Sequence, residues 1–208
     1  MPPVVGETTE QILAKLENAL KQQAPQLLEF LQPGLSDQEI TELERRAGVQ
    51  LPDDIKALYR WRNGCKLEQM KPSGRLSDVP VPNHRFVPLG EALGLQTVLS
   101  NQLAHVTTVQ KGAFEVFAGH RKSWVSLFDD GAGDGYFFDP KRASAIGAVF
   151  YCFAEDRTYV FFPSIKNLLA GIVKCYEKGA YTWKDGQLDN NFELSERIWD
   201  EFGASDIK

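Results

Sequence analysis

The chain has 208 residues, of which 43% are hydrophobic and 25% are charged, and its formal net charge is −5. This mixture is typical of a folded globular chain, and the length suits one domain with terminal extensions. Lys and Arg form no long run, so we expect no direct nucleic-acid ligand, and a basic partner would suit the acidic chain better.

No stretch of about 18 apolar residues occurs, and the first residues lack a basic segment followed by an apolar run, so neither a membrane span nor a secretion signal is expected. The three cysteines are widely spaced and contain no C-x-x-C pair, which argues against a disulfide scaffold. A location in the reducing cytoplasm is therefore predicted.

Three helices are predicted in the first third of the chain. Two residue pairs have the spacing of a capping box, Thr8 with Gln11 and Ser36 with Glu39. Pro52 suits the first turn of a third helix, which Asn63 and Gly64 should end. The second and third helices should form a hairpin.

The rest of the chain is predicted to be an irregular loop (66–88), a weak helix (89–103) and then an antiparallel meander. Short aromatic or β-branched runs indicate its strands, at 114–117, 124–128, 136–138, 149–153 and 158–162. Hairpin tips are expected at 129–135 and at Asp156-Arg157. Ser164 should cap a helix that ends at Gly179 and packs across one face of the sheet. The acidic and aromatic tail from Ala180 should form a short final helix or a partly exposed contact segment.

Asp129, Asp130 and Asp134 crowd a glycine-rich segment where carboxylates could hold a hard cation. However, Ala132 and Lys141 occupy two ligand positions of the calcium-loop pattern, so a simple hairpin turn is the preferred interpretation. The alternating glycines of this segment lie between two predicted strands, so no helix N-terminus is there to receive a phosphate, and nucleotide binding is not expected.

Other candidates for chemistry are weak. His84, His105 and His120 are far apart and share no ligand spacing with a carboxylate, so we expect no metal, no cofactor and no catalytic set. Trp61 lies on the opposite side of its helix from Leu58, which makes it a candidate for an exposed aromatic anchor, although a core position is the more common role.

Four segments together resemble the SMI1/KNR4 (SUKH) family. They are LSDQEITELERRAGVQLPDDIKALYRWRNG from Leu35, FVPL from Phe86, WVSLFDDGAGDGYFFDP from Trp124 with Gly147 beyond it, and YVFFPSIKNLLAGIV from Tyr159. The family-like positions, each expected to have a structural role, are Leu51, Pro52, Tyr59, Asn63, Gly64, Trp124, Gly135 and Gly147.

The resemblance implies an α+β fold in which helices pack against a largely antiparallel β-sheet. It also implies a family-like domain at 35–179, an N-terminal helical extension at 1–34, and a C-terminal extension at 180–208 packed on the same domain. Members of the family are understood as interaction modules: many bacterial ones as immunity proteins that neutralise a toxin, and fungal ones as factors in cell-wall synthesis and its signalling.

The sequence therefore predicts a non-enzymatic protein-binding module, most simply an immunity-type protein whose partner is a basic toxin domain. The predicted contact residues are Asp129, Asp130, Asp134, Asp139 and Trp61. Two alternatives remain: a scaffold or regulator of cell-wall synthesis, and a metal-dependent hydrolase that uses Asp129, Asp130 and Asp134.

Overall fold

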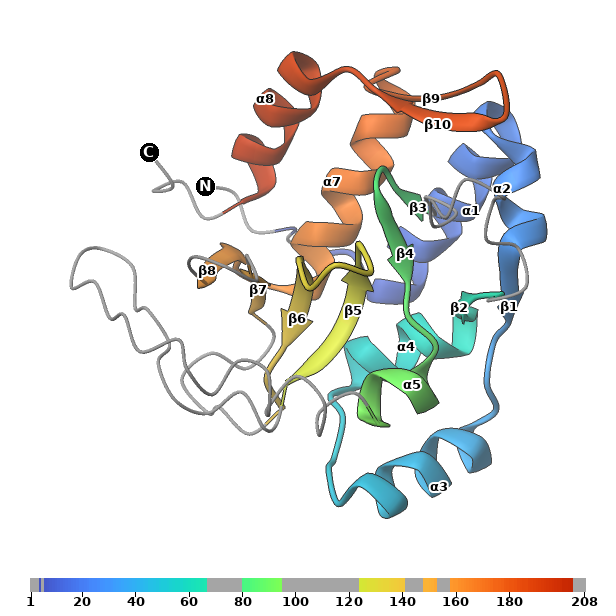
Figure 1. Ribbon diagram of the computed structural model, residues 1–208, viewed down its shortest axis with the longest axis vertical. Helices are drawn as coiled ribbons and strands as arrows, with labels where there is room; N and C mark the ends of the chain where they lie inside the picture. The colour runs from blue at the N-terminus through green and yellow to red at the C-terminus, as the bar shows by residue number, and fades with distance from the viewer. Residues whose placement is uncertain are drawn as a thin grey trace.

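The computed structural model describes residues 4, 6–66, 80–94, 124–140, 148–152 and 158–203, without the side chains of 158–160. Helices pack against an antiparallel sheet (Figure 1), which confirms the predicted α+β class. The helices are α1 (Thr9–Gln23), α2 (Pro25–Phe30), α3 (Asp37–Ala47), α4 (Asp53–Trp61), α5 (Leu89–Gly94), α7 (Ile165–Glu177) and α8 (Phe192–Phe202).

The main sheet contains strands β3 to β8, each paired antiparallel with the next strand along the chain. These strands are β3 (Pro80–Val81), β4 (His84–Phe86), β5 (Val125–Asp129), β6 (Gly135–Phe138), β7 (Val149–Cys152) and β8 (Thr158–Phe162). Two smaller ribbons join β1 (Leu31–Pro33) to β2 (Arg62–Cys65) and β9 (Tyr181–Lys184) to β10 (Gln187–Asn190).

Local capping sets where the helices begin. The Thr8 and Ser36 side chains accept hydrogen bonds from the backbone N–H of Gln11 and Glu39, and both capping boxes are complete, as predicted. Ser164 caps α7 through the N–H of Asn167. These bonds satisfy N–H groups that the first helical turn leaves without partners.

Three predictions need correction. First, α4 ends at Trp61, and Asn63 and Gly64 belong to strand β2. Second, the loop predicted at 66–88 contains β3 and β4. Proline is compatible with β3 because β3 is an edge strand, where the missing N–H of Pro80 need not pair with another strand. Third, the tail forms the β9–β10 ribbon before its helix, with Asp185 and Gly186 both at positive φ in the turn.

Some predictions lie outside the described residues. These are the strand at 114–117, the hairpin tip at Asp156-Arg157, the end of the weak helix beyond Gly94, and the positions of His105, His120 and Gly147.

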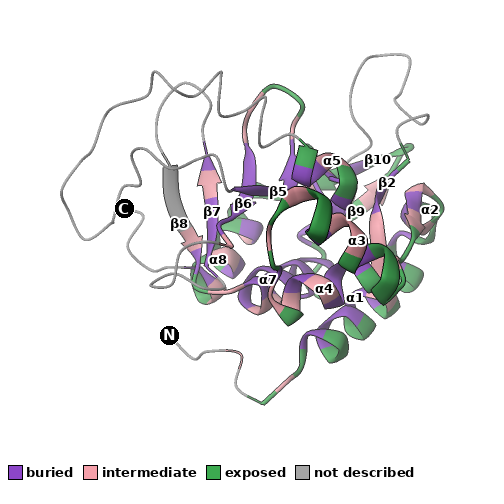
Figure 2. Ribbon diagram, turned by 90° about the horizontal axis from the view of Figure 1, so that it is seen from below, coloured by how far each residue is buried: buried purple, intermediate pink, exposed green. Residues whose placement is uncertain are grey.

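The core lies between α7, the sheet and the surrounding helices, as the buried ribbons in Figure 2 show. Leu16 of α1 and Ile198 of α8 belong to the same buried cluster as Phe138 of the sheet. Because side chains alternate along a strand, the preceding residue, Phe137, faces the other way, into a second cluster with Trp124 and Phe150. Both terminal segments therefore contribute side chains to one hydrophobic interior.

Candidate functional site

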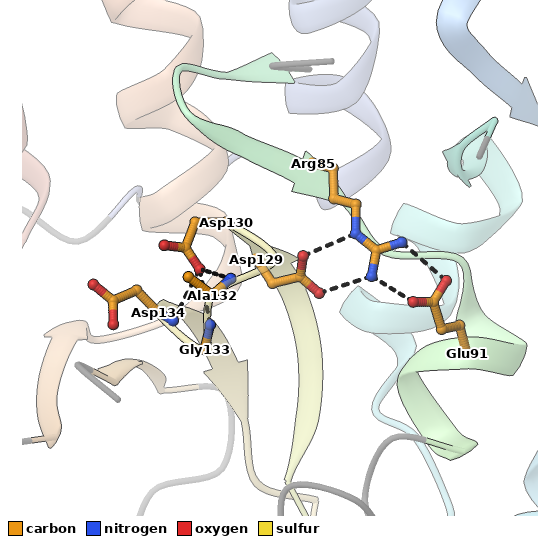
Figure 3. Close-up of polar contacts among 7 residues, drawn as sticks. All are labelled: Arg85, Glu91, Asp129, Asp130, Ala132, Gly133 and Asp134. Atoms are coloured by element: carbon orange, nitrogen blue, oxygen red, sulfur yellow. Dashed lines mark hydrogen bonds and ion pairs between the residues drawn. The ribbon is translucent and has the colours of Figure 1, made fainter. Parts of the chain in front are cut away.

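Asp129, predicted to lie on an acidic surface tip, is buried at the end of β5 with 9% of its surface exposed. Arg85 of β4 donates from Nε to Asp129 Oδ1 at 2.8 Å, and its guanidinium also contacts both carboxylate oxygens of Glu91 from α5 (Figure 3). Burial alone lowers the pKa of Arg85, but the hydrogen bonds that it donates to Glu91 and Asp129 outweigh this effect and raise the pKa. The cluster joins β4, β5 and α5, so its role is structural.

Asp130 organises the hairpin turn itself. Its Oδ1 accepts hydrogen bonds from the backbone N–H groups of Ala132, Gly133 and Asp134, at 2.8, 3.0 and 3.0 Å. The turn also places Gly131 and Gly133 at positive φ, where glycine has no steric penalty. This geometry confirms the interpretation of the segment as a hairpin turn.

The predicted contact residues are thus only partly at the surface. Asp130 and Asp134 are half-buried, whereas Asp129 and Asp139 are buried, so the four carboxylates are not equally exposed. Trp61 is half-buried, and its indole N–H donates to Glu17 Oε2 of α1 at 2.8 Å. Trp61 therefore contacts its own chain, and we leave it out of the candidate surface.

The three aspartates of the tip do not converge. In Figure 3 the Asp129 carboxylate points toward Arg85, away from Asp130 and Asp134. Within the described ranges, no group of three or more His, Cys, Asp or Glu side chains could hold a metal ion. The tip offers no geometry on which the hydrolase alternative could rest.

A different feature emerges beside the sheet: a groove of about 490 Å³. Five elements surround it: the turn between β3 and β4, the strands β6 and β8, the β9–β10 ribbon and helix α8. In Figure 1, α8 and the β9–β10 ribbon both lie on the side of the molecule toward which the β3–β4 turn points. The volume is in the range of sites that hold a small ligand or a few side chains of a partner.

Aromatic side chains form much of the groove wall. Trp199 of α8 lies 5.6 Å from Tyr136 and 5.5 Å from Phe161, measured between ring centroids. The indole N–H of Trp199 donates to Cys175 Sγ of α7 at 3.1 Å, which holds the ring in place. At the edge stands Phe192, which is 65% exposed and is the only strongly exposed large hydrophobic residue in the described part of the chain.

His84 lies at the turn side of the groove. Its Nδ1 is 3.0 Å from the carbonyl oxygen of Pro82, and its Nε2 is 3.2 Å from the Tyr151 hydroxyl. A carbonyl can only accept, so Nδ1 carries a proton, and in the neutral ring Nε2 then accepts from the Tyr151 hydroxyl. Burial first, and then the charges of Asp134 and Asp130, raise the pKa of Tyr151, so its hydroxyl keeps the proton that it donates.

This network places the acidic turn next to the groove. Tyr136 lines the groove and pairs with Tyr151 across β6 and β7, and the Tyr151 hydroxyl contacts His84. Asp134 lies two residues before Tyr136, and its N–H donates to Asp130. Glu196 and Asp200 of α8 also line the groove, whereas no described Lys or Arg does. The groove and the turn therefore form one negatively charged region, which we call the acidic aromatic face (Asp130, Asp134, His84, Phe192, Glu196, Trp199 and Asp200).

The family-like positions are structural where they are described. Tyr59 donates from its hydroxyl to Val87 O at 3.1 Å, and Asn63 Oδ1 accepts from the N–H of Leu89 at the start of α5. Gly64 and Gly135 allow close backbone approaches, since an added Cβ would lie 2.4 Å from Pro88 N and 2.3 Å from Phe128 O. The remaining ones are Leu51 and Trp124, both buried, and Pro52, the N-cap residue of α4.

The groove was not predicted because its residues come from segments that lie far apart in the sequence. Val81 and His84 lay in the predicted loop, while Phe192 and Trp199 lay in the tail. One signal was present: the tail from Trp183 to Phe202 carries more aromatic residues than a solvated terminus needs.

Helices that pack against a curled antiparallel sheet define an α+β fold. The comparison with protein families is specific: residues 34–171 match the SMI1/KNR4 family (SUKH-1). The chain belongs to this family. No curated protein matches it, and none of the described helices is long and apolar enough to cross a membrane.

Proposed function

We propose that this protein is a non-enzymatic protein-binding module of the immunity type, which binds a toxin protein in the cytoplasm and neutralises it. Membership of the SMI1/KNR4 family supports a role in protein–protein interaction. The observation that carries the proposal is the acidic aromatic face, with Phe192 exposed beside Trp199. Aromatic side chains at the centre of an interface supply most of its binding energy.

The charge of this face suits a basic partner. Asp130, Asp134, Glu196 and Asp200 would attract such a partner over a distance of about 10 Å at ordinary ionic strength. The aromatic groove would then provide the short-range contacts that keep the complex together. As part of this proposal, the segments 1–34 and 180–208 are extensions that pack on a family domain at 35–179, and the second of them supplies one wall of the groove.

The test is purification of the tagged chain from its native host at low salt, followed by reconstitution with the purified partner. We expect a complex of defined stoichiometry that weakens as salt rises, and a partner whose toxicity the chain suppresses. Recovery of no partner at low salt contradicts the proposal. A partner from cell-wall synthesis, with a growth defect on deletion in cells that meet no toxin, supports the scaffold alternative instead.

A variant links the binding to the face. Phe192→Ala should weaken the complex about tenfold or more, because a large exposed aromatic anchor is removed. Leu28→Ala is the matched control, since Leu28 is a half-buried apolar residue of α2 that does not line the groove. Equal affinities of the two variants would place the contact surface elsewhere.

A further inference from the structure

We propose that the groove is a receptor for a single arginine side chain of the partner protein. This inference rests on the proposed function, because it names the chemistry by which the same face recognises its partner. It makes a narrower claim than the proposed function, since a partner could bind this face without inserting a cation.

The charge of the groove selects a cation. Glu196 and Asp200 both lie on the groove side of α8, four residues apart and therefore one helical turn apart. Neither forms an ion pair with a Lys or Arg of the described residues. On the same helix, by contrast, Glu193 and Arg197 form an ion pair with each other. Two carboxylates without a Lys or Arg partner among the described residues thus line the groove beside its aromatic side chains.

The aromatic wall favours guanidinium over ammonium. Tyr136, Phe161 and Trp199 present π systems, and a planar guanidinium stacks on such rings more readily than a lysine ammonium does. The hydrogen bond from the Trp199 indole to Cys175 already orients the ring. Binding therefore costs little conformational entropy at this side chain. A guanidinium can contact a ring face and a carboxylate at the same time.

One polar atom of the groove lining lacks a donor among the described residues. Asn190 lines the groove, and its Oδ1 is buried without a hydrogen-bond partner in the described part of the chain. A buried acceptor without a donor costs about 1–3 kcal/mol, and a guanidinium carries five N–H groups. A small shift of the amide toward such a ligand would satisfy it.

The turn between β3 and β4, which forms another part of the groove wall, has a restricted backbone conformation. Pro82 and Asn83 form the two-residue turn between β3 and β4, and Asn83 has a φ of +62°, as the second central residue of a type II turn requires. Proline fixes the first central residue of such a turn, and asparagine tolerates the left-handed region at the second. The turn therefore forms a rigid wall facing α8.

The probe is the peptide acetyl-Gly-Arg-Gly-amide, compared with the same peptide carrying citrulline, which is uncharged and nearly isosteric. Binding is followed by two-dimensional NMR of the labelled full chain, with the indole N–H of Trp199 as the reporter. We expect saturable shifts of Trp199 and its groove neighbours with the arginine peptide, at millimolar concentration, and much smaller shifts with the citrulline peptide.

Two adjacent residues provide matched variants. Asp200 lines the groove and Glu201 does not, although both are exposed carboxylates of α8. Asp200→Asn should weaken the arginine peptide roughly three- to fivefold, the effect of losing one partly exposed charge partner. Glu201→Gln should change the affinity by less than half as much.

Four results would overturn the inference: no shift of groove residues, equal binding of the citrulline peptide, equal effects of the two variants, or groove shifts that depend on protein concentration without peptide. The last result would mean that a second copy of the chain fills the groove. A partner protein that binds wild type and Asp200→Asn equally well would leave the proposed function intact while rejecting the arginine receptor.

Discussion

At the scale of single residues, the largely buried cluster of Arg85, Asp129 and Glu91 joins strands β4 and β5 to helix α5. The Arg85 side chain is 11% exposed and holds one carboxylate from β5 and one from α5. Removal of a buried charge leaves its partners without compensation, which costs more than the ion pair contributes.

We therefore expect Arg85→Met to lower the free energy of unfolding by about 3–5 kcal/mol in urea denaturation. Arg45→Met is the matched control, because Arg45 pairs with Glu42 on an exposed helix surface, where such pairs contribute about 0–1 kcal/mol. A small effect of Arg85→Met, similar to that of the control, would show that the cluster does not hold the two elements together.

The buried thiols give the protein a pH-dependent stability. Burial raises the pKa of Cys65 to about 12 and that of Cys175 to about 11. An unfolded thiol titrates near 8.5, so the folded state keeps a proton that the unfolded state loses. The contribution of these thiols to the free energy of unfolding is therefore fully present below about pH 8.5, and it decreases as the pH rises toward the pKa of the folded state.

The prediction concerns Cys65→Ala under reducing conditions. Between pH 8 and pH 10, wild type should lose about 2 kcal/mol more stability than the variant, because only wild type has this thiol to deprotonate on unfolding. Urea unfolding at the two pH values measures the difference. Parallel losses in the two proteins would mean that Cys65 is not held protonated by burial.

At the scale of elements, glycine conformation fixes how the strand after α4 meets the sheet. Gly64 has a φ of +74°, and an added Cβ would lie 2.4 Å from the backbone nitrogen of Pro88. Gly48, which ends α3, has a φ of +64° but no atom within 4 Å of such a Cβ. A substitution at Gly48 therefore tests backbone strain alone, whereas one at Gly64 tests backbone strain together with steric overlap.

Gly48→Ala should lower the free energy of unfolding by about 1–2 kcal/mol, because alanine is strained in the left-handed region. Gly64→Ala should cost more than 3 kcal/mol, since the strand must also move away from Pro88. Thermal and urea unfolding of both variants measure this difference. Similar losses would show that the contact with Pro88 relaxes easily.

Much of the element order was predictable because local chemistry determines it. The capping boxes at Thr8 and Ser36, and the Ser164 cap, lie within three residues of the groups they bond, so the sequence alone reveals them. Strand β2 was missed because Arg62 to Cys65 is a strand only through its pairing with β1, about 30 residues earlier. The β9–β10 turn carried an Asp-Gly signal that could have been read.

At the scale of the whole molecule, the N-terminal helix behaves as part of the core. Leu16 of α1 is fully buried, in the same cluster as residues of α7 and the sheet. Leu16→Ala should lower stability by about 2–5 kcal/mol in a single cooperative transition, whereas Asn18→Ala, on the exposed side of α1, should have little effect. A separate early transition would mean that α1 unfolds independently.

The site could be predicted only in part, and for a physical reason. The sequence shows that Asp129, Asp130 and Asp134 are close along the chain, but not that Arg85 neutralises the first and backbone amides hold the second. Conversely, no local pattern brings His84 and Trp199 to one groove, since that depends on how α8 packs beside the sheet. Burial therefore removes Asp129 from the candidate surface, and long-range packing extends this surface from Asp130 and Asp134 to the adjoining groove.

Hydrogen–deuterium exchange of the chain, with and without its purified partner, tests the central claim that the acidic aromatic face is the contact surface. The account predicts that the partner protects residues 80–86 and 190–203, which form the two walls of the groove. Protection confined to α1, α3 or other elements away from the groove would contradict it.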